Sequence, residues 1–104
     1  MTMANSNSST VIEIATFQIK VGVSAVAFNK FDQAVQVEHV SKQPGFISRE
    51  TAVTETGAWL VIVHWQSVED AEASMASFGD APAAAQFMAN LDASTMEMKR
   101  YIRN

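Results

Sequence analysis

Two histidines, His39 and His64, are the side chains of this chain best suited to moving protons near neutral pH. His64 stands inside residues 59–66, the most apolar segment of the sequence. A neutral imidazole in dry surroundings can act as a general base, so we predict His64 as a catalytic residue. The alternative is a buried or interfacial histidine that is held by one hydrogen bond.

The two tryptophans flank this histidine. Trp59 and Trp65 are six residues apart, so they point to the same face of the predicted strand. Two indoles on one face could form the wall of a site for a flat apolar ligand. Tryptophan is also common in cores and subunit interfaces, which is the competing interpretation.

Several methionines in the second half of the chain, together with Phe78 and Phe87, would lie between helix and sheet. Such side chains adapt to an irregular ligand, although they also fill gaps in a core. We predict that they line a substrate site. The predicted lining comprises Met75, Phe78 and Met88, with Phe87, Met96 and Met98 in the same gap.

Arg49 is a charge on an otherwise apolar strand. If it faces a cavity, its guanidinium could orient a carboxylate or a phenolate through two hydrogen bonds, and Tyr101 could donate a third. We therefore predict Arg49 as catalytic and Tyr101 as substrate-binding. Alternatively, Arg49, Glu50 and Arg100 are charges that discourage stray strand pairing.

Metal chemistry is not expected. The chain has no cysteine, which excludes disulfides, thiolate chemistry and cysteine-ligated zinc. Two lone histidines without a suitably spaced Asp or Glu do not make a metal site. His39, next to Glu38 near the end of a helix, is more typical of a solvated residue at the rim of the fold. We predict no metal and no cofactor.

Changes of hydrophobic period along the chain place these residues on a βαββαβ framework. Ser24 and Ser67 are typical helix N-caps, and Pro44-Gly45 ends the first helix. The segment at residues 59–66 predicts a strand that is buried on both faces. Strands are predicted at 11–20, 46–54, 58–66 and 95–102, helices at 25–43, 68–78 and 81–91, and a loop at 92–94. Right-handed crossovers turn this order into an α+β, ferredoxin-like fold with one antiparallel sheet.

Composition sets further limits. A length of 104 residues indicates one domain, predicted at 11–104 after a disordered polar tail at 1–10. The net charge of −4 argues against a nucleic-acid partner, and no apolar run is long enough to span a membrane. Apolar residues make up 48% of this short chain, so we expect a second copy to cover one sheet face as a homodimer. The lack of cysteine suits the cytoplasm.

Four segments resemble the antibiotic biosynthesis monooxygenase-like superfamily of dimeric α/β-barrel proteins, in particular its short uncharacterised bacterial members. The resemblance spans residues 11–102. It rests on the first strand with its Val21-Gly22-Val23-Ser24 exit, on Gln43-Pro44-Gly45-Phe46, on Trp65-Gln66-Ser67-Val68-Glu69-Asp70-Ala71, and on the short helix at 81–91. The strand Gly45-Phe46-Ile47-Ser48-Arg49-Glu50 resembles that of the short bacterial members.

The resemblance implies a homodimer and a small apolar or aromatic ligand. Its characterised activities include cofactor-free oxygenation of aromatic polyketides, isomerisation and heme degradation. The heme-degrading members carry an Asn on the first strand and a Trp and a His on the second helix. Here Ser74 and Ala84 stand near the last two positions and the first strand has no Asn, so heme is not expected.

The sequence therefore predicts a small-molecule-binding protein. If it is an enzyme, the resemblance implies a cofactor-independent monooxygenase that acts on an aromatic or quinol-like substrate. The alternative is a non-catalytic ligand-binding or stress-related dimeric module.

Overall fold

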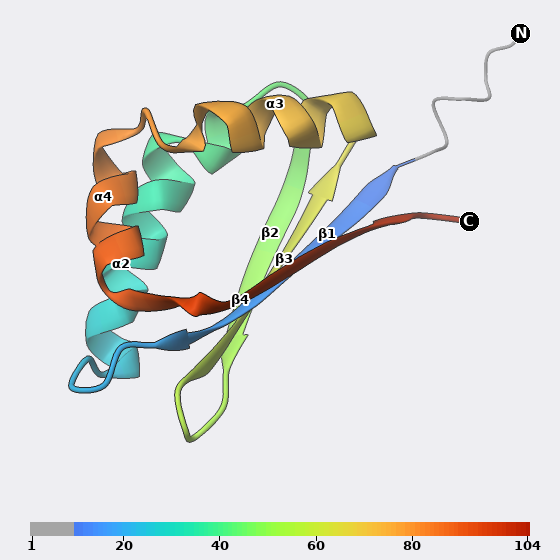
Figure 1. Cartoon of the computed structure of the whole chain (residues 1–104). Coiled ribbons are helices and arrows are strands. Elements are labelled where there is room, and N and C mark those ends of the chain that lie inside the picture. Colours follow the sequence, from blue (N-terminus) through green and yellow to red (C-terminus); the bar gives the residue numbers. More distant parts are fainter. Residues whose placement is uncertain (1–9) are drawn as a thin grey trace, which may run out of the picture.

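Four strands form one antiparallel sheet in the order β2-β3-β1-β4 (Figure 1). The computed structural model describes residues 10–104, so only Thr10 of the predicted tail lies within the described residues. The edge strand β4 runs the full length of β1, and their outer ends lie side by side. The strands are β1 (Val11–Ile19), β2 (Phe46–Val53), β3 (Ala58–Trp65) and β4 (Leu91–Ile102).

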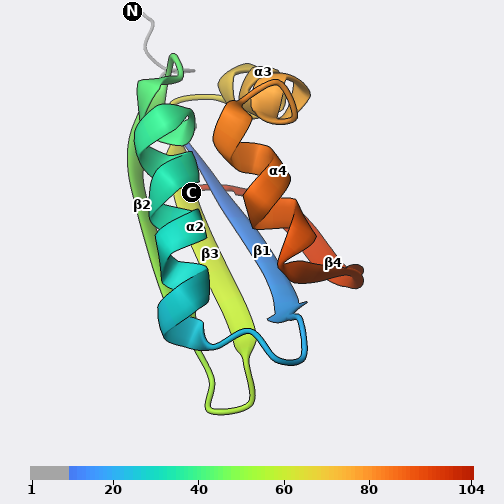
Figure 2. The same ribbon diagram turned by 90° about the vertical axis from the view of Figure 1, so that its left-hand side faces the viewer.

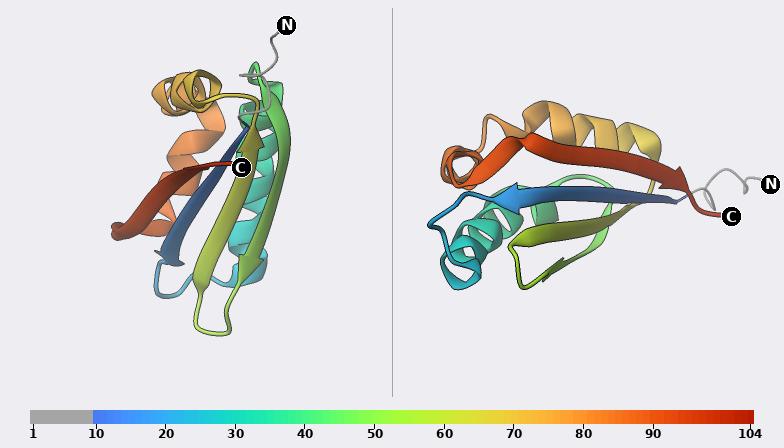
Figure 3. Two further views of the ribbon diagram at one scale, coloured as in Figure 1. Left: turned by 90° about the vertical axis from the view of Figure 1, so that its right-hand side faces the viewer. Right: turned by 60° about the horizontal axis from the view of Figure 1, so that its bottom comes forward.

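All helices lie on one side of this sheet (Figure 2), and the strands alone form the other side (Figure 3). The helices are α2 (Ala25–Glu38), α3 (Val68–Phe78) and α4 (Pro82–Ala89), with a short 3₁₀ turn η1 (Val40–Lys42) after α2. This arrangement confirms the predicted α+β, ferredoxin-like βαββαβ fold. None of the helices in residues 10–104 is both long and apolar enough to cross a membrane.

The predicted starts of α2 and α3 are confirmed by side-chain caps. Ser24 Oγ accepts a hydrogen bond from Ala27 N at 3.0 Å, and Ser67 Oγ accepts one from Asp70 N at 3.1 Å. Ser67 Oγ also donates to Asp70 Oδ2 at 2.9 Å. These bonds satisfy backbone N–H groups that have no partner inside the helix, and so fix where each helix begins.

Two boundaries differ from the predictions by more than two residues. The residues predicted as a loop at 92–94 belong to β4. There Asp92 Oδ1 accepts a hydrogen bond from Ser94 N at 3.1 Å, and the pairing of β4 with β1 shifts register between Thr16 and Gln18 of β1. A bulge of this kind lets turn-forming residues remain within a strand. The first helix ends at Glu38 rather than at residue 43, because the chain tightens there into η1, which apolar spacing does not distinguish from α-helix.

The two faces of the sheet differ in burial. Along β3, buried residues alternate with half-buried ones, so within one copy only the face toward the helices is fully buried. Burial of this strand on both faces stays a prediction. The odd-numbered residues Trp59, Val61, Val63 and Trp65 point to the helices. On the other face, which we call the open face, no element of residues 10–104 covers the half-buried side chains. Its apolar centre consists of Ile12, Ile14, Leu60 and Ile62.

Candidate functional site

A cavity of about 330 Å³ lies between the helix side of the sheet and α3 and α4. All four strands contribute to its wall, so the sheet holds it rigidly. Most of the lining is apolar, which suits a ligand with little polar surface. The lining comprises Glu13, Ala15, Phe17, Val40, Arg49, Val61, Val63, Trp65, Ser74, Met75, Phe78, Gly79, Phe87, Met88, Met96 and Met98.

Glu13 is the one carboxylate in this lining, and only 6% of the residue is exposed. Its Oε2 accepts a hydrogen bond from Arg100 Nε at 2.6 Å, and its Oε1 accepts one from Trp65 Nε1 at 3.3 Å. Arg100 stands opposite Glu13 on β4 and is about a quarter exposed. The ion pair compensates the cost of burying the carboxylate beside an apolar space.

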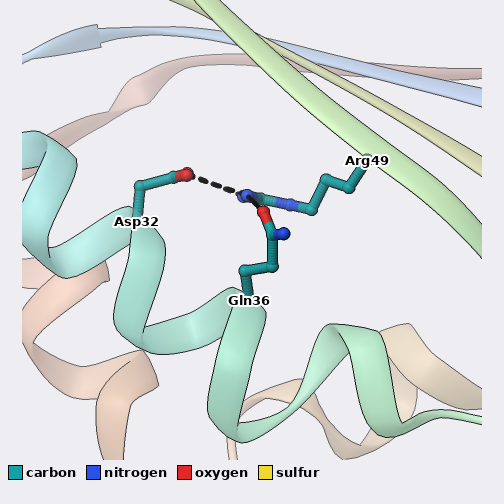
Figure 4. A network of polar contacts seen from close by, with 3 residues as sticks. All are labelled: Asp32, Gln36 and Arg49. Carbon is teal, nitrogen blue, oxygen red and sulfur yellow. Dashed lines mark hydrogen bonds and ion pairs between the residues drawn. The ribbon is translucent and has the colours of Figure 1, made fainter.

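Arg49 is the cation in the cavity wall, and its guanidinium is already engaged (Figure 4). Nη1 donates to Asp32 Oδ2 at 2.8 Å and Nη2 donates to Asp32 Oδ1 at 2.7 Å. Nη1 also donates to Gln36 Oε1 at 3.1 Å. Both charged side chains are sealed from solvent, at 3% and 0% exposure. The pair ties the edge strand β2 to α2 and neutralises this end of the cavity.

His39 lies just outside the cavity, between the ends of α2 and α3. Its Nε2 is 2.7 Å from Ser77 Oγ, and its ring packs edge-on against Phe78, with ring centroids 5.6 Å apart. Nδ1 is buried and has no hydrogen-bond partner among residues 10–104. Burial lowers the pKa of His39 below 6.5, against the opposing effect of the negative charge of Asp80. His39 is therefore a buried helix-junction residue, and the prediction of a solvated rim histidine is wrong.

The structure brings together much of the predicted ligand lining. Trp65, Met75, Phe78 and Met88 all line the cavity, as do Phe87, Met96 and Met98. Trp59 faces the same side of the sheet but is outside the lining, packed against Phe28 with ring centroids 4.9 Å apart. Whether the lining residues bind a substrate stays a prediction.

Two predicted site residues lie on the open face instead. His64 pairs with Ile12 and Ser48, and Tyr101 also pairs with Ile12, so both side chains point away from the cavity. A site that contained both His64 and Trp65 would need groups from opposite faces of one sheet. The roles predicted for His64, Tyr101 and Arg49 stay predictions. Neither His64 nor Tyr101 lines the cavity.

Sequence reasoning missed two polar residues of the cavity, Glu13 and Ser74. Glu13 had a visible signal, since a charged residue at an inward position of an apolar strand needs a partner in the folded protein. That partner, Arg100, is 87 residues away in the sequence, so the pair could not be predicted from the sequence alone. Ser74 carried no such signal, because a serine on a helix is common at the surface.

A wider, shallower hollow of about 760 Å³ lies at the far end of the sheet, between the loop after β1 and the β2–β3 turn. Its lining contains none of the buried polar residues of the described chain, Glu13, Asp32, His39 and Ser74. Among residues 10–104, no three His, Asp or Glu side chains gather into a group that could hold a metal ion. The helix-side cavity is therefore the candidate site.

Solved structures with the same architecture are numerous. SnoaB, a cofactor-independent oxygenase from Streptomyces nogalater, superposes with a TM-score of 0.76 at 16% identity, over 92% of this chain and 94% of SnoaB. A candidate antibiotic biosynthesis monooxygenase from Chloroflexus aurantiacus gives a TM-score of 0.67 at 22% identity, over 92% and 94% of the two chains. The fold is that of the antibiotic biosynthesis monooxygenase-like proteins.

A conserved protein from Methanosarcina mazei has this fold as well, with a TM-score of 0.75 at 15% identity over 94% of this chain and 96% of the other. No family model and no curated protein sequence matches the chain. The superfamily resemblance is thus confirmed at the level of the fold. One fold hosts many activities, so the function has to be argued from the cavity.

Proposed function

We propose that this protein binds a flat, largely apolar small molecule in the helix-side cavity and oxygenates it without a cofactor. The substrate class is aromatic or quinol-like. The observation that carries the proposal is the cavity itself, a mostly apolar space held by all four strands with one carboxylate, Glu13, in its wall. SnoaB, which has the same fold, is a cofactor-independent oxygenase, and this likeness supports the proposal.

The chemistry requires little from the protein. A base removes a proton from the substrate, and the resulting anion donates electrons to dioxygen. For a hydroquinone, one oxygen atom enters the ring and the other leaves as water, so hydroquinone and dioxygen give a hydroxyquinone and water. The substrate supplies all the electrons, and the protein contributes a base, an oriented site and the exclusion of water.

A second function has an observation in its favour. Arg49, the cation of the cavity wall, donates from both terminal nitrogens to Asp32, so a developing negative charge in the cavity would have to compete with this carboxylate. A non-catalytic ligand-binding or stress-related dimer needs no cation to stabilise such a charge. The same cavity would then hold a ligand without turnover.

We further propose that two copies pair through the open face into a homodimer in the cytoplasm. Ile12, Ile14, Leu60 and Ile62 form an apolar centre that residues 10–104 leave uncovered. The open face of a second copy carries the same apolar patch. Pairing of a patch with its own copy is the usual basis of a twofold dimer.

Dioxygen uptake with a hydroquinone, measured without added cofactor or metal, tests the catalytic proposal. Uptake by the wild type, and its loss in a variant with a filled cavity, are the expected results. Ser74→Phe places a ring in the cavity, whereas Ala73→Phe places the same ring on the exposed side of α3. Ligand binding without uptake would favour the non-catalytic module.

A further inference from the structure

The Glu13 carboxylate has hydrogen-bonding capacity left over. An ionised carboxylate offers about four acceptor positions on its two oxygens. The structure fills two of them, with Arg100 Nε on Oε2 and Trp65 Nε1 on Oε1, and the second of these bonds is long, at 3.3 Å. Glu13 also lines the cavity and is only 6% exposed, so a molecule bound in the cavity can reach the unfilled positions.

The charges around the cavity restrict which molecule can use these positions. Arg49 is the cation of the described lining, and Asp32 engages both of its terminal nitrogens. Arg100 is engaged by Glu13 itself. Among the described lining residues, a ligand carboxylate would therefore meet no unengaged cation. It would approach the negative charge of Glu13 beside mostly apolar surfaces, where like charges repel more strongly than in bulk water.

We infer that the cavity selects a neutral, flat ligand that carries a hydroxyl group, and that this hydroxyl donates its hydrogen bond to Glu13. The ligand class is a phenol or hydroquinone rather than an aryl ether or an aromatic acid. This inference rests on the proposed binding function and adds the group that decides specificity. Trp65 fixes the carboxylate from one side, and the methionines leave the rest of the wall adaptable.

Three compounds with one ring system separate the possibilities: 2-naphthol, its methyl ether and 2-naphthoate. The first donates a hydrogen bond, the second cannot, and the third is an anion. Calorimetric titration of the wild type should show 2-naphthol binding about 10- to 100-fold more tightly than the ether, as expected for a hydrogen bond to a charged group. The naphthoate should bind more weakly than either.

Glu13→Gln should reduce the preference for the naphthol over the ether, because a neutral amide oxygen accepts a weaker hydrogen bond than a carboxylate, and it should weaken the rejection of the naphthoate. Arg100→Gln is the matched control, because it breaks the same ion pair but keeps the carboxylate, and it should retain the preference. Thermal unfolding establishes that each variant is folded. If Glu13→Gln does not fold, the binding of naphthol and ether to the wild type and to Arg100→Gln still shows whether the cavity prefers the hydroxyl compound and whether that preference needs the ion pair.

The outcomes distinguish the two proposals. Equal binding of naphthol and ether by the wild type overturns the role of Glu13, while it leaves the cavity as an apolar binding site. Loss of the preference in Arg100→Gln as well as in Glu13→Gln also overturns that role, since the intact ion pair would then be the cause. If none of the three compounds binds, both the inference and the proposed function are wrong.

Discussion

Arg49 on β2 and Asp32 on α2 form two parallel hydrogen bonds of 2.8 and 2.7 Å, with both side chains sealed from solvent. The pair joins the edge strand of the sheet to the first helix. Gln36 Oε1 accepts a third bond from the same guanidinium at 3.1 Å. A buried pair of this kind offsets its own desolvation only while both partners are present.

Removing one partner of this pair should be far more damaging than removing both. Arg49→Met leaves the carboxylate of Asp32 buried without its cation, and we expect a loss of about 3–5 kcal/mol in the free energy of unfolding. The double variant Asp32→Leu with Arg49→Met should be close to the wild type or more stable. Urea unfolding of the single and double variants measures both values, and equal losses in the two would contradict this account.

Gly45 should be the most sensitive glycine of the chain. Its backbone has a φ of +81°, and a Cβ there would overlap the side chain of Asp70, which Ser67 holds in place. We expect Gly45→Ala to cost more than the roughly 1–3 kcal/mol of a strained backbone alone. Gly22→Ala is the control, since Gly22 has a φ of +90° with no atom within 4 Å of the added Cβ. Similar losses of thermal stability in both variants would show that the Asp70 contact is unimportant.

The order of helices and strands and the apolar lining of the cavity were predictable from the sequence, whereas the polar pairs of the site were not. Helix starts were predictable because Ser24 and Ser67 act on their own helices, a few residues away. The cavity lining was partly predictable because apolar side chains have to face the core. The polar pairs were not, since Arg49 finds Asp32 17 residues away, across two elements.

His64 shows a different limit. It is adjacent to Trp65, and the alternation of a strand already implied that the two point to opposite faces. The sequence did not say which face the helices would cover, because both faces of the strand are apolar. Only the packing of α3 and α4 assigns the cavity to the side of Trp65.

Acid should destabilise the protein through His39. Burial lowers the pKa of this imidazole from 6.5, so the unfolded chain binds the proton at a higher pH than the folded chain. The contribution of His39 to stability is therefore complete above about pH 6.5 and is lost as the pH falls from there toward the lowered pKa of the folded state.

The free energy of unfolding measured by urea titration between pH 7 and pH 5 checks this expectation. His39→Gln keeps a polar group near Ser77 without a titrating ring, so its stability should decline less over this range than that of the wild type. His64→Gln removes the other histidine and serves as the reference. An identical decline in the wild type and in His39→Gln would show that the burial of His39 has no consequence for acid stability.

A single charge on the open face should separate the proposed dimer. Ile62 pairs with Ile14 on one side and with Glu50 on the other, so a lysine at this position can meet a carboxylate within its own sheet and remain folded. We expect Ile62→Lys to sediment as a monomer at micromolar concentration, where the wild type is a dimer. Val26→Lys adds the same charge at a position that is 77% exposed on α2 and should remain dimeric. A monomeric wild type would remove the dimer proposal.

The two faces of the sheet offer different candidates for the base. Glu13 lines the cavity, whereas His64 points to the open face. If turnover occurs in the cavity, Glu13→Gln should lower dioxygen uptake by about 10²–10⁴-fold, the usual contribution of a general base. His64→Gln should lower it less than tenfold and should instead cost stability, on the order of 1–3 kcal/mol, if the imidazole is a buried polar group of the dimer. The reverse result, a large loss of rate in His64→Gln and none in Glu13→Gln, would place the chemistry on the open face, where a second copy would have to complete the site.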